Sequence, residues 1–146
     1  MSAARILLDT NVLSELMRPR PEPLVLDWFS AQGPQTRFMI SAVTQAEILL
    51  GIALLPAGKK RSSLAQAART LFEEEFHGMN LAFDEHAAPG YAEMVASRGR
   101  SGSPISVEDA QIAAIAVHHR LPLATRNTQD FASLPGLVLM NPWQGV

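Results

Sequence analysis

The sequence predicts an α/β fold in which a parallel sheet is covered by helices on both faces. Short apolar runs alternate with longer segments of helical spacing, and such alternation is typical of parallel sheets buried on both sides. A length of 146 residues fits one domain, and a hydrophobic content of 47% is enough for a core. Because ligands of such sheets bind beyond the carboxyl ends of the strands, polar residues at those ends are the first candidates for a site.

The first half of the chain contains two expected strands, at residues 6–8 and 37–40, and three expected helices, at 10–17, 24–31 and 43–55. The first helix has apolar residues at helical spacing and is stopped by a run of prolines that starts at Pro19. Gly33 and Pro34 end the second helix, and Pro56 ends the third, which is mostly apolar. The strand between them, 37–40, is identified by its apolar residues.

The second half continues the pattern with strands at residues 81–83, 121–125 and 137–140 and helices at 63–76, 85–97 and 106–119. Residues 56–63 are predicted to form a turn, because they combine proline, glycine and serine with charged residues. The stretch 98–104, RGRSGSP, is expected to be the most flexible. The sequence contains no internal repeat and no low-complexity tract.

The composition excludes several classes of protein. The absence of cysteine excludes disulfides and thiolate metal sites, and it fits a reducing compartment. A net charge of −2 excludes a strongly basic nucleic-acid coat. The first residues lack the apolar stretch of a signal peptide, and the apolar run 48–55 is too short to span a bilayer. We therefore expect a soluble cytoplasmic protein without a membrane partner.

Two carboxylates in the first half follow the first two strands. Asp9 ends the run RILLD, where it could also serve as the N-cap of the next helix. Glu47 lies near the start of the third helix, and Thr44-x-x-Glu47 matches a capping box. The positions one turn beyond Glu47 are apolar or glycine, however, so its carboxylate projects from an otherwise apolar face.

Two further carboxylates lie in the second half. Asp109 is in PISVEDAQIAAIAV, where Ser106-x-x-Asp109 is again a possible capping box and small apolar residues share the face of Asp109. Asp130 is in ATRNTQDF, after the fourth strand, where its alternative role is that of a turn residue.

The four acids together indicate a cation site, because a parallel sheet brings the ends of its strands to one edge. Two carboxylates about 5 Å apart at an effective dielectric near 20 repel by roughly 3 kcal/mol. A helix N-terminus returns only about 0.3–1 kcal/mol to each of them. A divalent cation can hold several carboxylates in one pocket, and a ligand set made only of oxygen suits Mg²⁺ or Mn²⁺.

At these residues the sequence resembles the PIN-domain family, and within it the VapC and FitB branch of bacterial toxins from toxin–antitoxin pairs. The resemblance is carried, in this order, by LLDTNVLSEL, TQAEILLGIALLPAGKKR, ISVEDAQIAAIA and LPLATRNTQDF, and it runs from about residue 5 to Trp143. It implies a single PIN-like domain over residues 1–146. The implied fold is a three-layer sandwich, with a five-stranded parallel sheet flanked by helices.

The resemblance also implies an activity and partners. It implies a Mg²⁺- or Mn²⁺-dependent endoribonuclease whose acidic quartet falls on Asp9, Glu47, Asp109 and Asp130. We expect Asp9 and Asp109 to bind the metal directly or through water, and Glu47 and Asp130 to complete the site. The resemblance further implies a homodimer and a cognate antitoxin, which would block the acidic pocket and bind operator DNA together with the toxin.

Helper residues are expected beside the quartet. The family's polar positions fall on Thr10 or Asn11, on Thr125 and on Asn127. Asn11 and Asn127 would steer carboxylates, and Thr125 would contact the scissile phosphate or a water molecule.

Basic side chains and apolar helix faces are the remaining candidates for contacts with partners. Contacts with the nucleic-acid backbone are expected from Arg126 and, on weaker grounds, from Lys59, Lys60, Arg61, Arg98 and Arg100, for which a solvated loop is the alternative. The exposed faces of the helices around residues 12–17 and 48–55 are expected to form an apolar surface for the dimer or the antitoxin.

Two other functions are considered. An aspartate phosphotransferase also places an acid after its first strand, but Asp9-Thr10-Asn11 lacks the second aspartate and no lysine follows the later strands. A non-catalytic binding module would use the same acidic pocket to dock an arginine of a partner, and this alternative stays open.

Overall fold

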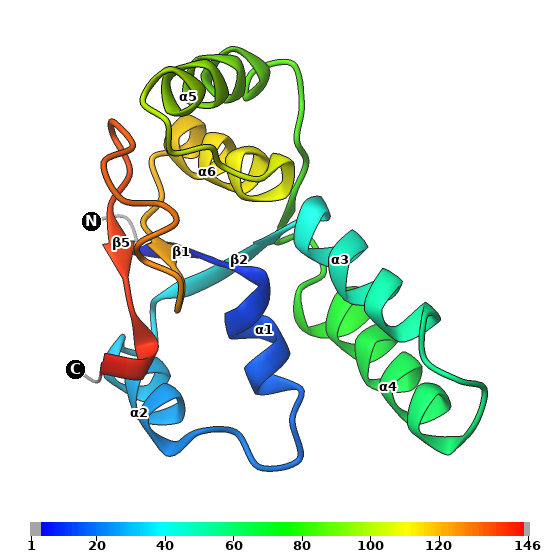
Figure 1. Cartoon of the computed structure of the whole chain (residues 1–146). Coiled ribbons are helices and arrows are strands. Elements are labelled where there is room, and N and C mark those ends of the chain that lie inside the picture. Colours follow the sequence, from blue (N-terminus) through cyan, green and yellow to red (C-terminus); the bar gives the residue numbers. More distant parts are fainter. Residues whose placement is uncertain (1–3, 145–146) are drawn as a thin grey trace.

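Five parallel strands form the sheet of this protein, whose computed structural model describes residues 4–144 (Figure 1). The strands are β1 (Arg5–Leu8), β2 (Arg37–Ser41), β3 (Asn80–Leu81), β4 (Leu123–Ala124) and β5 (Leu139–Met140). Their order is β3-β2-β1-β4-β5, so β1 lies at the centre with β2 and β4 as neighbours. The predicted parallel sheet is confirmed. The two ends of the predicted domain, 1–3 and 145–146, lie outside the described residues.

The helices cover both faces of this sheet. They are α1 (Thr10–Leu16), α2 (Pro23–Ala31), α3 (Ala42–Ala53), α4 (Lys59–Thr70), α5 (Ala88–Arg100) and α6 (Val107–His119), with a π-helical turn η1 (Leu71–Glu75) and a 3₁₀ turn η2 (Pro142–Gln144). Figure 1 shows α5 and α6 together on one side of the strands and α1 to α4 on the other. The predicted three-layer arrangement is therefore confirmed.

Alternate side chains of β1 enter two separate cores. Leu7 packs in one core with residues of α5 and α6, among them Met94 and Ile112. Ile6 and Leu8 point to the opposite face, where they pack with residues of α1 to α4. This alternation is the period of two of an extended strand, and it explains why β1 is apolar at every position that follows Arg5.

Several predicted boundaries were wrong: the last three strands are shorter than predicted, and three boundaries at helices and turns differ. The turn predicted at 56–63 ends at Gly58, and Lys59 to Ser62 already belong to α4, because lysine and arginine favour helix. Helix α5 begins at Ala88 rather than near residue 85, since the side chain of Asp84 accepts hydrogen bonds from the amides of His86 and Ala87 and holds a turn there. Residues 98–100 of the predicted flexible stretch are the last residues of α5.

The apolar surface predicted on two helices is found on only one of them. In the first predicted segment, 12–17, Val12 and Leu13 are fully buried, so this segment cannot present them to a partner. In contrast, Leu50 on α3 is 60% exposed, and Leu54, the C-cap residue of α3, is 76% exposed. Within residues 4–144, none of the helices has the length and apolar character needed to cross a membrane.

Candidate active site

The carboxylate of Asp9 lies at the carboxyl end of the central strand, where β1 passes directly into α1. Its Oδ1 accepts a hydrogen bond of 2.8 Å from the backbone N–H of Thr10, so Asp9 is the N-cap of α1, as one of the two sequence-based alternatives predicts. Its Oδ2 accepts a second hydrogen bond of 2.7 Å from the hydroxyl of Thr125, which follows β4. Because β4 pairs with β1 in parallel, Thr125 lies beside Asp9. The same carboxylate therefore caps α1 with one oxygen and contacts the residue after β4 with the other.

Asp9 is almost completely buried, with 4% of its surface exposed. The pKa of its carboxyl group is raised to about 6, chiefly by burial, and the negative charges of Asp109 and Glu47 contribute in the same direction. The hydrogen bonds from Thr125 and Thr10 oppose this shift only in part. The ionised form of Asp9 is therefore costly in the free protein, and a positive charge placed beside it would relieve that cost.

Asn11 and Thr125 connect the start of α1 to the loop after β4. The Asn11 side chain donates to the Thr125 hydroxyl oxygen over 3.4 Å and accepts from the backbone N–H of Arg126 over 3.3 Å. The backbone N–H of Asn127 also donates to the Thr125 oxygen, over 3.0 Å. Since Thr125 accepts these bonds, its single hydroxyl hydrogen is directed to Asp9.

Glu47 is held toward Asp9 by two threonines. The hydroxyl of Thr10 donates to Glu47 Oε1 over 2.7 Å, and the Thr10 oxygen lies 2.9 Å from the hydroxyl of buried Thr44. Ser41, not Thr44, caps α3, because its hydroxyl accepts from the backbone N–H of Thr44. The capping-box alternative for Glu47 was therefore wrong, and its second carboxylate oxygen makes no hydrogen bond to any described residue.

Asp109 and Asp130 extend the acidic region away from Asp9. Ser106 caps α6 and accepts a hydrogen bond from the backbone N–H of Asp109, in agreement with the predicted cap. Partial burial raises the pKa of Asp109, a hydrogen bond with Ser106 opposes the shift, and the charges of Asp130 and Glu47 add to it. Asp130 is exposed and lies in a turn, as its alternative role predicts.

The four acids lie near one another but do not form a finished cation site. The charges of Asp109 and Glu47 act on Asp9, and those of Asp130 and Glu47 act on Asp109, so the quartet is electrostatically connected. Among residues 4–144, however, no three acidic or histidine side chains are close enough to hold a metal ion as they stand. The available donors are carboxylate and hydroxyl oxygens, which suit Mg²⁺ or Mn²⁺ in type. Binding an ion would require these carboxylates to come closer together.

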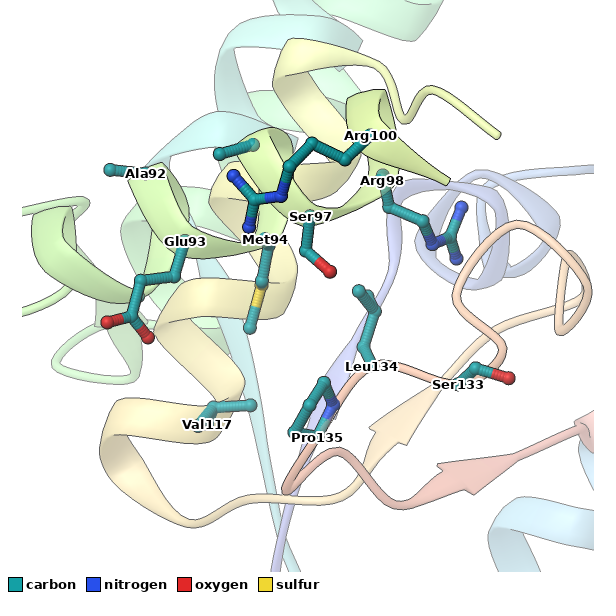
Figure 2. Close-up of a pocket in the computed structure, with 12 residues that line it drawn as sticks. Ala92, Glu93, Met94, Ser97, Arg98, Arg100, Val117, Ser133, Leu134 and Pro135 are labelled. Atoms are coloured by element: carbon teal, nitrogen blue, oxygen red, sulfur yellow. The ribbon is translucent and has the colours of Figure 1, made fainter. Parts of the chain in front are cut away.

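One hollow lies at the start of α6, and another lies beside α5 and near the end of α6. A polar hollow of about 290 Å³ is lined by both Asp109 and Asp130, together with Arg98 and Gln129. A larger one, of about 620 Å³, lies between α5 and the turn around Leu134, and it contains none of the four acids (Figure 2). Of these two hollows, the smaller one belongs to the candidate site.

The predicted basic contact residues lie in different parts of the molecule. The guanidinium of Arg126 stacks over the ring of Trp143, 5.1 Å from its centroid, beside Thr125. Lys59, Lys60 and Arg61 begin α4 at the far end of the α3–α4 pair, away from the carboxyl ends of the strands (Figure 1). Arg98 and Arg100 are in the last turn of α5. Arg126 and Arg98 are the two that lie near the acids in this structure.

Two contributions were missed from sequence. Thr44 was considered only as a cap, although its position three residues before Glu47 puts both side chains on one face of α3. Arg98 was considered only as a contact for nucleic acid, whereas its guanidinium donates hydrogen bonds to the chain's own backbone. No local signal identifies these partners of Arg98, because two of them lie more than 30 residues away.

Comparison with known proteins finds a matching domain family and close sequence relatives. The sequence model of the PIN domain matches residues 6–137. Over 139 residues, the chain is 40% identical to the VapC ribonuclease Y4jK of Sinorhizobium fredii, an alignment that covers 95% of this chain and 98% of the relative. It is also 39% identical over 138 residues to Toxin FitB of Neisseria gonorrhoeae, covering 94% and 98%.

A solved structure supports the same assignment. The structure of FitAB bound to an IR36 DNA fragment contains a chain that superposes on this one with a TM-score of 0.84 at 38% sequence identity. The superposition covers 94% of this chain and 95% of that chain.

Proposed function

Because this chain belongs to the PIN-domain family, we propose that it is a divalent-cation-dependent endoribonuclease and the toxin of a type II toxin–antitoxin pair. The observation that carries the proposal is Asp9, a nearly buried carboxylate at the end of the central strand. The charges of Asp109 and Glu47 act on it, and that of Asp130 acts on Asp109. A relative of 40% identity is named a VapC ribonuclease, which supports RNA as the substrate.

Asp9 and Asp109 would hold the cation, and Glu47 and Asp130 would complete the site from either side. Each oxygen of Asp9 accepts one hydrogen bond, so each keeps a lone pair for a ligand. A bound Mg²⁺ or Mn²⁺ would neutralise charge on the phosphodiester and supply an activated water molecule. Thr125, held by Asn11 and Asn127, fixes the orientation of Asp9, and Thr10 fixes that of Glu47. Arg126, at the rim beside Thr125, would attract the RNA backbone.

The proposed partners follow from the chemistry of the same surface. An acidic hollow attracts a basic side chain, so an antitoxin would block the site by inserting one between Asp109 and Asp130. The exposed Leu50 of α3 and Leu54 at its C-cap would be covered by the antitoxin or by a second copy in a homodimer. A neighbouring structure is a FitAB complex on DNA, which supports binding of operator DNA by the toxin–antitoxin complex.

The test is hydrolysis of a structured RNA by the purified, partner-free chain in Mg²⁺. We expect cleavage that stops with EDTA and is lost in Asp9→Asn and in Asp109→Asn. The control is Asp27→Asn, which changes an exposed aspartate on α2 and should cleave like the wild type. All three variants should keep the fold.

The competing function, a non-catalytic module that docks an arginine, gives a different result. In that case the wild-type RNA would be recovered intact although the protein is folded and binds the metal. Loss of folding in both Asp9→Asn and Asp109→Asn would instead assign these residues a purely structural role as helix caps.

A further inference from the structure

The guanidinium of Arg98 holds three backbone carbonyl groups at once. Its Nη2 donates to the carbonyl of Asp130 over 2.7 Å and to that of Ala132 over 2.9 Å. Its Nη1 donates to the carbonyl of Ser103 over 3.3 Å. Figure 2 shows the Arg98 side chain directed toward the turn that contains Ser133, whereas Arg100 extends away from that turn along α5.

These carbonyls belong to the two segments that carry the outer acids. Ser103 lies in the loop that leads to Ser106, the cap of α6, and α6 carries Asp109 in its first turn. The other two carbonyls are in the turn of Asp130 itself. One side chain from the end of α5 therefore connects the loop before Asp109 to the turn of Asp130. Arg98, Ser103 and Asp130 line the polar hollow, whereas Ala132 does not.

The contact with the carbonyl of Asp130 leaves its carboxylate unused. An arginine this close to an aspartate ordinarily forms an ion pair with the carboxylate, which would compete with a cation. Among residues 4–144, no ion pair engages either Asp109 or Asp130. Arg98 thus fixes the backbone that carries Asp130 and does not neutralise its side chain.

We propose that Arg98 is a positioning residue, which keeps Asp130 beside Asp109 by clamping the turn of Asp130 and the loop before α6 to the end of α5. Its effect on cation binding rests on the proposed function, but the clamp itself does not. This role differs from a contact with the nucleic-acid backbone, in which the positive charge of Arg98 would act directly on RNA.

The two roles are separated by a conservative pair of variants. Arg98→Lys keeps the charge but loses the planar fork that reaches several carbonyls, and Arg98→Met keeps only the length. Arg100→Lys and Arg100→Met are matched controls, since Arg100 is exposed in the same helical turn and donates no hydrogen bond within residues 4–144. The full-length chain would be measured by amide hydrogen exchange, by Mn²⁺ binding without RNA, and by steady-state RNA cleavage.

We expect both Arg98 variants to exchange faster at residues 101–106 and 128–133 and to bind Mn²⁺ about tenfold more weakly. Their kcat should fall while KM for RNA stays unchanged, and the Arg100 variants should behave like the wild type. If Arg98→Met does not fold, Arg98→Lys alone decides the question.

Unchanged exchange and Mn²⁺ affinity in Arg98→Lys would overturn the clamp, and a raised KM in Arg98→Met alone would assign the residue to RNA binding. If the wild type cleaves no RNA, the proposed nuclease function fails. Hydrogen exchange still tests the clamp in that case, because it is measured without metal or substrate.

Discussion

The ionisation of Asp9 gives a quantitative prediction for the metal-free protein. The pKa of this carboxyl is raised from an ordinary value of 3.8 to about 6. Each pKa unit corresponds to about 1.4 kcal/mol, so keeping Asp9 ionised in the folded state costs roughly 3 kcal/mol. Between pH 4 and pH 6 the folded chain holds a proton that the unfolded chain releases. The contribution of Asp9 to the free energy of unfolding is therefore lost as the pH rises through this window, and it is fully present only below about pH 4.

The variant Asp9→Asn removes this ionisation and keeps the shape of the side chain. The new amide oxygen can still accept from the N–H of Thr10, as Oδ1 does now. The new NH₂ group faces the hydroxyl oxygen of Thr125, which already accepts from Asn127 and Asn11. That mismatch should cost about 1 kcal/mol at every pH. We expect Asp9→Asn to be slightly less stable than the wild type at pH 4 and about 2 kcal/mol more stable at pH 8.

The assay is urea unfolding in EDTA at fixed protein concentration, for the wild type and for Asp9→Asn, between pH 4 and pH 8. The quantity of interest is the difference between their free energies of unfolding, because the other titrating groups largely cancel in it. The exposed aspartate of α2 supplies the control Asp27→Asn, whose difference from the wild type should not change with pH. A difference for Asp9→Asn that is also independent of pH would refute the assignment of a costly, raised-pKa carboxylate to this position.

Three further outcomes are expected. Mg²⁺ should raise the thermal midpoint of the wild type at pH 7.5 but much less at pH 5, where Asp9 is protonated, and calorimetry in both buffers checks this. Thr125→Val should lower the free energy of unfolding by about 1–3 kcal/mol, because it removes the donor to Asp9 and leaves the Asn11 side chain and the N–H of Asn127 without this acceptor. Equal urea midpoints would contradict this. Glu15→Gln should also lower the free energy of unfolding by roughly 1–3 kcal/mol, since this buried carboxylate accepts hydrogen bonds from Arg18 and from the backbone N–H of Glu22. RNA cleavage by the folded variant should be unchanged.

The order of the elements and the position of the acids could be predicted from the sequence because both depend on nearby residues. The apolar run of β1, the prolines after α1 and the cap at Ser106 act over a few positions, so their local spacing is sufficient. A parallel sheet then brings the carboxyl ends of its strands to one edge, which places Asp9 and the segment of Thr125 at the same edge. Boundaries were less predictable where a side chain forms its own turn, as Asp84 does before α5.

The partner of each oxygen was decided only by the tertiary structure. Asp9 meets Thr125 across 116 positions of the chain, and Glu47 meets Thr10 across 37, so the spacing within either segment contains no information about these contacts. The same is true of Arg98, whose charge predicted a surface contact while its geometry gives it three carbonyl groups. Residue types and their local periodicity determined which groups come to the edge of the sheet. Packing of distant segments decided how deeply Asp9 is buried and which donors reach it, because solvent exclusion and hydrogen-bond geometry exist only once those segments are in contact.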